Sequence, residues 1–171
     1  FITGGYLIFV LLIFIYLPLK ESSIRSSNIE FSMDEKITSG GPEAIKSEFG
    51  DALPFADKGR LLLCFFAPGC DHCKATIRSI DSLSKIIPDF PKVEIIFMEE
   101  EVEKIPEFFE YAGGEYSYRV LDIASFYNVL TWERNTPGVF YMWNGNILKE
   151  FDGIEEKSFD AKELKKVINT N

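Results

Sequence analysis

Two cysteines separated by two residues, Cys70 and Cys73, are the side chains of this sequence best suited to do chemistry. They follow an apolar run over residues 60–67, bounded by Gly59 and Pro68-Gly69, which predicts a short buried β-strand. After them, apolar residues recur at helical spacing up to Pro88, which predicts a helix: Ile77, Ile80, Leu83 and Ile87. The pair therefore stands where a strand ends and a helix begins. The free N–H groups and the dipole of a helix start favour a thiolate, so this placement predicts a redox-active dithiol.

Other uses of a C-x-x-C pair fit this sequence less well. A structural zinc site takes four ligands, but the chain offers no second C-x-x-C and a single histidine, His72. Attachment of a c-type haem requires a histidine directly after the second cysteine, and here that residue is Lys74. We therefore predict neither a bound metal nor another cofactor. The third cysteine, Cys64, lies within the apolar run, which favours a small buried side chain over a third redox partner.

The segment 62–74, Leu-Leu-Cys-Phe-Phe-Ala-Pro-Gly-Cys-Asp-His-Cys-Lys, resembles the active-site segment of the thioredoxin superfamily. It is most similar to the TlpA-like, membrane-tethered thiol–disulfide oxidoreductases, and the resemblance extends over residues 43–168. It implies a thioredoxin fold of the α/β class, in which a central mixed β-sheet is flanked by helices. It also implies that Cys70 is the catalytic nucleophile and that Cys73 resolves the mixed disulfide. The implied partners are protein thiols and disulfides together with a second redox protein.

The resemblance assigns a second part of the site to Thr136-Pro137. In the superfamily a cis-proline faces the dithiol, and the residue before it pairs its backbone with the substrate. Pro137 precedes a predicted strand and matches this proline, so Thr136 is the expected substrate contact. A Thr-Pro pair by itself more often forms an ordinary trans turn, although an X–Pro bond adopts the cis form at small cost. With the dithiol upstream, we predict a cis bond.

The two residues between the cysteines are expected to tune Cys70 in opposite directions. A protonated His72 stabilises the Cys70 thiolate and with it the reduced form, which makes the disulfide more oxidising. The carboxylate of Asp71 raises the pKa of a neighbouring thiol. The sequence leaves the sign of the net effect open.

Three positions depart from the common pattern of the superfamily. An aromatic residue often precedes the first cysteine, where this chain has Gly69, and Cys64 stands where cytosolic thioredoxins bury an acid that helps proton transfer. The loop 131–135, which precedes the predicted cis-proline, is longer than in the simplest members. Within it we interpret Glu133 and Arg134 as exposed loop residues, with a substrate contact or a substitute proton donor as the alternative.

The remaining pattern follows the element order of the thioredoxin fold. A second apolar run over residues 93–98 predicts a strand parallel to the first, because a long helix connects the two. Ahead of the first strand, the spacing of Ile45, Phe49 and Leu53 predicts a helix that packs on the sheet. The other expected elements are a helix over 105–112, an edge strand over 118–123, a helix over 124–130, strands over 138–143 and 146–151 joined by a hairpin turn at Asn144-Gly145, and a final helix over 159–168.

The N-terminal segment lies outside the resemblance. Residues 1–19 are nearly all apolar and carry no charge, which matches the length of a bilayer-spanning helix. We predict a transmembrane helix over 1–19, a Ser-rich linker over 20–41 and a thioredoxin-like domain over 42–171. The span fits a single N-terminal anchor or the last span of a longer membrane protein of the DoxX type. A thioredoxin-like domain beyond such a span usually faces the periplasm or another extracytoplasmic space, where disulfides persist, and we expect that location.

Charge and motif together leave two hypotheses for function. The net charge of −9 argues against nucleic-acid binding, which needs a Lys/Arg surface. The favoured function is a membrane-tethered thiol–disulfide oxidoreductase that exchanges disulfides with protein substrates. The alternative is a non-catalytic, tethered redox-sensing or scaffold domain that uses the same dithiol as a switch.

Overall fold

The computed structural model of the protein describes residues 41–170. The elements of this part follow in the order β1 (Arg60–Phe66), α2 (Asp71–Ser84), β2 (Lys92–Met98), α3 (Ile105–Ala112), β3 (Ser117–Leu121), α4 (Ile123–Leu130), β4 (Gly138–Trp143), β5 (Asn146–Asp152) and α5 (Ala161–Thr170). Two 3-10 helices, η1 (Pro54–Asp57) and η2 (Val102–Lys104), precede β1 and α3. The expected membrane span and all of the expected linker except Gly41 lie outside the described residues. Within residues 41–170, no helix combines the length and the apolar composition needed to cross a bilayer.

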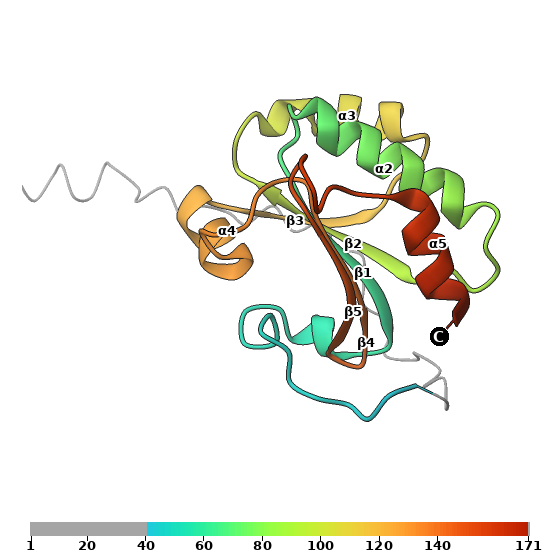
Figure 1. Ribbon diagram of the computed structural model, residues 1–171. Helices are drawn as coiled ribbons and strands as arrows, with labels where there is room; N and C mark the ends of the chain where they lie inside the picture. The colour runs from blue at the N-terminus through green and yellow to red at the C-terminus, as the bar shows by residue number, and fades with distance from the viewer. Residues whose placement is uncertain (1–40, 171) are drawn as a thin grey trace, which may run out of the picture. The chain divides into compact units, whose positions relative to one another are not determined.

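The strands form one mixed sheet in the order β3-β2-β1-β4-β5 (Figure 1). Strands β1, β2 and β3 are parallel, as predicted for two strands joined by a helix, and β4 runs antiparallel to β1 and β5. The turn between β4 and β5 is the predicted hairpin, in which Asn144 and Gly145 both have positive φ. The C-terminal end of β1 and the N-terminal end of β4 therefore lie side by side at one end of the sheet, because Phe65 pairs with Gly138.

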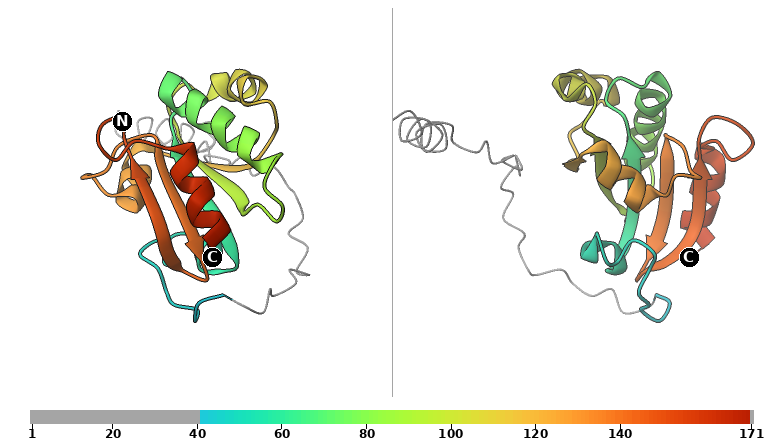
Figure 2. Two further views of the ribbon diagram at one scale, coloured as in Figure 1. Left: turned by 45° about the vertical axis from the view of Figure 1, so that its right-hand side comes forward. Right: turned by 90° about the vertical axis from the view of Figure 1, so that its left-hand side faces the viewer.

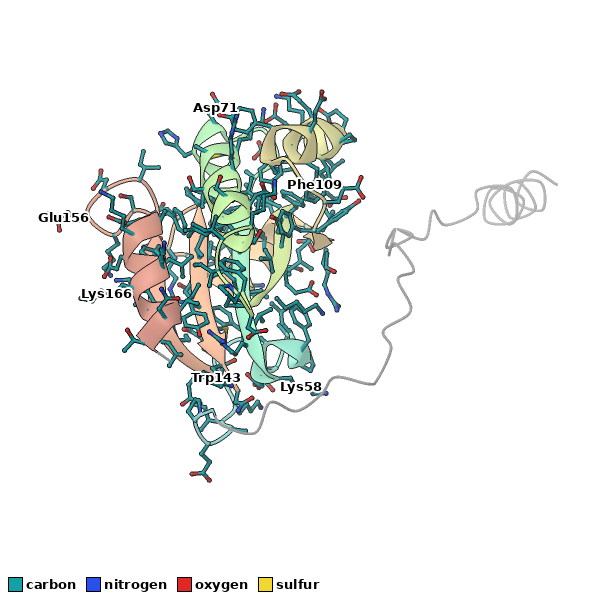
Figure 3. All side chains as sticks on the ribbon, turned by 90° about the vertical axis from the view of Figure 1, so that its right-hand side faces the viewer. Lys58, Asp71, Phe109, Trp143, Glu156 and Lys166 are labelled. Carbon is teal, nitrogen blue, oxygen red and sulfur yellow. The ribbon has the colours of Figure 1, made fainter. Side chains whose placement is uncertain are left out.

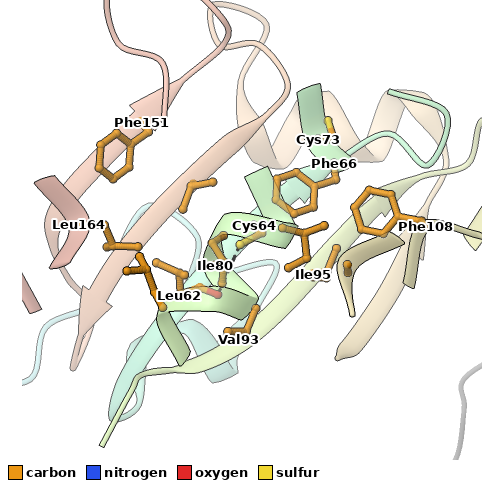
Figure 4. Close-up of a cluster of buried hydrophobic side chains, with 14 of the residues drawn as sticks. Leu62, Cys64, Phe66, Cys73, Ile80, Val93, Ile95, Phe108, Phe151 and Leu164 are labelled. Atoms are coloured by element: carbon orange, nitrogen blue, oxygen red, sulfur yellow. Dashed lines mark hydrogen bonds between the residues drawn. The ribbon is translucent and has the colours of Figure 1, made fainter. Parts of the chain in front are cut away.

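Strand β1 lies at the centre of the sheet and is buried on both faces. Its alternate residues Leu62, Cys64 and Phe66 join a core covered by α2, α3 and α5 (Figure 4). The residues between them, Leu61, Leu63 and Phe65, join a second core covered by α4, η1 and Phe49. Figure 2 shows these helices on the two sides of the sheet. The unbroken apolar run in the sequence thus reflects a strand that faces helices on both sides.

The segment before β1 differs from its prediction. The spacing of Ile45, Phe49 and Leu53 predicts a helix, but the segment contains turns and is helical only in η1. The reason is that its backbone bonds to the β4–β5 turn: Ile45 N–H donates to Asn144 O at 3.0 Å, and the Asn144 amide donates to Pro42 O at 3.0 Å. Phe49 and Leu53 still enter the core, whereas Ile45 is half exposed.

Two element boundaries also differ from the sequence-based ranges because aspartates begin the following helices. The edge strand β3 ends at Leu121, and the Asp122 carboxylate accepts the N–H of Ser125 at 3.0 Å to cap α4. The final helix begins at Ala161, and Asp160 accepts the N–H groups of Lys162 and Glu163.

Candidate active site

Cys70 occupies the N-cap position of α2, directly after the turn that ends β1. Its N–H donates to Ala67 O at 3.1 Å, and its carbonyl accepts the N–H of Lys74 at 3.0 Å, which closes the first helical turn. The Cys70 sulfur accepts the N–H of Cys73 at 3.3 Å, so the sulfur takes the place of the oxygen that usually caps a helix. In Figure 3, Asp71 marks this start of α2, at the opposite end of the sheet from Lys58 and Trp143.

The pKa of Cys70 is lowered from 9.0 to about 6. The largest cause is the hydrogen bond from the Cys73 thiol, and the backbone N–H groups of Cys73 and His72 and the charge of His72 add to it. Partial burial of the sulfur opposes these effects. At neutral pH the thiolate form of Cys70 therefore predominates, and its sulfur is partly exposed to solvent.

Cys73 has the opposite properties. It is completely buried, and burial is the main reason why its pKa is raised far above that of an ordinary thiol. The neighbouring Cys70 adds to the increase, whereas a side-chain hydrogen bond with Thr136 opposes it. The site therefore combines one accessible thiolate with one buried, protonated thiol, and the two sulfurs do not form a disulfide in this structure.

Thr136 and Pro137 lie beside the dithiol, where β4 begins. The peptide bond between them is cis, as the sequence predicts. The Thr136 side chain forms a hydrogen bond with Cys73. Pro137 lines a groove together with His72 and Thr76 of α2. Ile154 and Phe159, from the loop between β5 and α5, form the other side of this groove. Residues far apart in the sequence thus meet in this groove, along the first turns of α2.

Known structures share this arrangement of elements. A secreted disulfide oxidoreductase of Mycobacterium tuberculosis, homologous to the DsbE protein of E. coli, superimposes with a TM-score of 0.55 at 12% identity, over 66% of this chain and 82% of that chain. A thiol:disulfide interchange protein of the thioredoxin family from Chlorobium tepidum gives a TM-score of 0.54 at 13% identity, over 69% of this chain and 83% of that chain. The chain has the thioredoxin fold.

A curated protein shows similarity in sequence as well. Protein TlpB of Flavobacterium psychrophilum is 39% identical over 150 residues, which are 88% of this chain and 41% of the relative. The chain thus spans less than half of the length of this relative. No family model matches the sequence.

The two residues between the cysteines differ in their effect on Cys70. His72 is exposed at the start of α2, and both its backbone and its charge lower the pKa of Cys70. The Asp71 carboxylate was expected to raise the pKa of Cys70. Asp71 is also exposed, however, so water screens its charge. The contribution that raises the pKa of Cys70 in the structure comes from burial of the sulfur.

Glu101 lies over Gly69, the position where an aromatic residue often precedes the first cysteine. A Cβ atom added to Gly69 would lie 1.7 Å from the Oε2 atom of Glu101, so the Glu101 carboxylate fills the space of a side chain at this position. Glu101 pairs with Lys104 and adopts a left-handed backbone conformation, φ 55°, where η2 begins. The sequence gives no local sign of this contact, because residues 69 and 101 meet only through the parallel pairing of β1 with β2.

Cys64 has no exposed surface and does not replace the buried acid of cytosolic thioredoxins. Its thiol lies 3.8 Å from Leu62 O, and burial raises its pKa, so it is protonated at neutral pH. It precedes Phe66 by two residues on the same face of β1, and Figure 4 shows Phe66 between Cys64 and Cys73. These positions support the prediction of a buried hydrophobic side chain rather than a third redox partner.

Arg134 corrects the interpretation of the loop before Pro137. The sequence predicts an exposed residue, but the Arg134 side chain is only 17% exposed and forms ion pairs with Glu48 and Glu150. Glu133, its neighbour, is exposed as expected. The positions of Glu48 and Glu150, respectively 86 and 16 residues away, explain why the sequence gives no local sign of this anchor.

The low pKa of Cys70 predicts a pH-dependent reaction with iodoacetamide. Alkylation of Cys70 should be slow in acid and reach a plateau above neutral pH, with a midpoint near pH 6. His72→Gln removes a stabilising charge, so the midpoint should move upward and the rate at pH 6 should fall. The control Arg78→Gln removes a cation from the exposed face of the same helix and should leave the midpoint unchanged. A wild-type midpoint near 9 would contradict the assigned thiolate.

Proposed function

We propose that the protein is a thiol–disulfide oxidoreductase that exchanges disulfides with protein substrates through Cys70 and Cys73. The observation that carries this proposal is the pairing of an accessible Cys70 thiolate with a buried Cys73 thiol beside the cis bond of Thr136-Pro137. The shared fold and the similarity to disulfide oxidoreductases support it.

In the first step, the Cys70 thiolate attacks one sulfur of a substrate disulfide. A bond forms between Cys70 Sγ and that sulfur, the substrate disulfide breaks, and the other substrate sulfur leaves as a thiolate. The attacking sulfur needs no base, because Cys70 is already deprotonated at neutral pH. The backbone at Thr136 and the groove beside Pro137 hold the substrate segment in the proposed complex.

In the second step, Cys73 gives its proton to water and attacks Cys70 Sγ. The mixed disulfide breaks, the second substrate thiolate leaves, and a Cys70–Cys73 disulfide remains. Two electrons have moved from the dithiol to the substrate, and the same steps in reverse oxidise a substrate dithiol. Formation of the mixed disulfide removes the negative charge of Cys70, which eases deprotonation of Cys73, and the Thr136 side chain stabilises the resulting thiolate. A second redox protein restores the pair between turnovers.

Single substitutions separate this enzyme from a redox switch. Cys70→Ser should abolish the catalysed reduction of insulin by dithiothreitol, because the nucleophile is lost. Cys73→Ser should also stop turnover but accumulate mixed disulfides with protein substrates, because nothing resolves them. Turbidity of the precipitating insulin B chain and non-reducing gels measure the two outcomes. Cys64→Ser is the matched control, and its mixed disulfides should not accumulate above the wild-type level.

Two results would contradict the proposal. Full activity of Cys70→Ser would remove Cys70 from the role of nucleophile. A wild-type protein that changes once between oxidised and reduced states, yet never accelerates insulin reduction, would support the sensor or scaffold instead.

We also propose that residues 1–19 tether this domain to a membrane and that the domain lies on the extracytoplasmic side. The apolar run of residues 1–19 carries no charge and has the length of a bilayer span, which supports the tether. Disulfides persist in extracytoplasmic compartments, which supports the location. An anchor of this kind would keep the dithiol close to membrane-bound redox partners and substrates.

Labelling of intact cells tests this location. A membrane-impermeant maleimide should react with the wild-type protein at Cys70, because the other two cysteines are buried. The Cys70→Ser variant should not be labelled under the same conditions. The labelled protein should stay in the membrane fraction after alkaline carbonate extraction. Labelling only after cell lysis would contradict the location, and release by carbonate would contradict the tether.

A further inference from the structure

Arg134 connects the loop before the cis-proline to two distant parts of the domain. One of its terminal nitrogens donates to Glu48 Oε2 at 2.9 Å and the other to Glu48 Oε1 at 2.9 Å, which is a bidentate pair. Its Nε donates to Glu150 Oε1 at 2.9 Å. Glu48 belongs to the segment before β1, and Glu150 belongs to β5. One guanidinium thus joins three segments of the chain.

The surroundings of Arg134 make this connection firmer than an ordinary surface ion pair. The guanidinium carbon lies 5.0 Å from the ring centre of Phe140 and 5.9 Å from that of Phe49, and both phenylalanines are completely buried. The charge is therefore partly removed from water, held over aromatic rings and paired twice. The pKa of Arg134 is raised by its two carboxylate partners, chiefly Glu48, so its charge is constant over the working range of pH.

The residues that follow Arg134 in the loop are also attached to the end of β5. Asn135 N–H donates to Asp152 Oδ1 at 2.6 Å, and Gly153 N–H donates to Pro137 O at 3.1 Å. The chain from Arg134 to Pro137 is therefore fixed at both ends and once between. Thr136, whose side chain reaches Cys73, lies between these attachments.

We propose that Arg134 is a positioning residue that fixes the Thr136-Pro137 segment where a protein substrate docks against the dithiol. This inference rests on the proposed oxidoreductase function. Arg134 does not touch the sulfurs; it acts by holding the backbone that a substrate segment pairs with. Its loss should therefore weaken the binding of protein substrates and leave the intrinsic reactivity of the Cys70 thiolate unchanged.

The test compares two reactions of the full chain. Insulin reduction requires docking of a polypeptide, whereas alkylation of Cys70 by iodoacetamide does not. Arg134→Met should raise the KM for insulin about tenfold, change kcat less than about threefold and leave the alkylation rate and its pH midpoint unchanged. Arg134→Lys keeps the charge but lacks the planar fork, so its KM should lie between those of the wild type and Arg134→Met.

Arg60 provides a matched control. It is also an arginine packed on aromatic rings, since its guanidinium lies 5.1 Å from the Trp143 ring and donates to Tyr141 Oη at 3.0 Å. It begins β1, at the end of the sheet away from Cys70, where Figure 3 shows Trp143. Arg60→Met should reduce the urea midpoint to a similar degree as Arg134→Met but leave the KM for insulin at the wild-type value.

The outcomes separate this inference from the proposed function. An inactive wild-type protein would overturn the proposed function, and the inference with it. An active wild type with an unchanged KM in Arg134→Met would overturn the inference alone, as would an equal rise of KM in Arg60→Met. If Arg134→Met does not fold, Glu48→Gln serves instead, because it alters one exposed partner and retains the pair with Glu150. It should raise KM about threefold, and an unchanged KM would overturn the inference.

Discussion

The sulfur of Cys70 completes the N-terminus of helix α2. An α-helix leaves its first N–H groups without partners, and a side-chain oxygen usually accepts one of them. Here the acceptor is a sulfur that receives the N–H of Cys73, and the bond is strongest when that sulfur is charged. One interaction therefore caps the helix and stabilises the thiolate. The reactivity of Cys70 thus depends on where α2 starts, and this in turn depends on the end of strand β1.

Burial makes the two cysteines chemically different. Cys73 lies on the face of α2 that packs against the sheet, together with Ile77 and Ile80. Cys73 is completely buried there, whereas Cys70 stays at the surface. Burial raises the pKa of Cys73, whereas the hydrogen bonds from the Cys73 thiol and from backbone N–H groups lower the pKa of Cys70. The Thr136 side chain partly offsets the cost of charge on Cys73, which connects the dithiol to the cis-proline segment.

The sequence predicted features that have local causes. The apolar strand before Cys70 and the Asn144-Gly145 turn each depend on residue types within a few positions. The cis bond before Pro137 is different, because it was predicted from the resemblance and the dithiol upstream rather than from the Thr-Pro pair alone. The helix predicted from Ile45 onward failed because the hairpin turn, about 100 residues later, takes its backbone hydrogen bonds. Glu101 over Gly69 and the anchors of Arg134 were missed for the same reason: these contacts form only once the sheet has brought distant segments together.

The reduction potential of the Cys70–Cys73 pair, measured against pH, tests the central claim most directly. Reduction of the disulfide takes up two protons below the pKa of Cys70 and one proton above it. The slope should therefore change from ~59 to ~30 mV per pH unit. The account predicts this change near pH 6, where Cys70 loses its proton. A single slope of ~59 mV that continues to pH 8 would contradict the account, because both thiols would then be protonated at neutral pH.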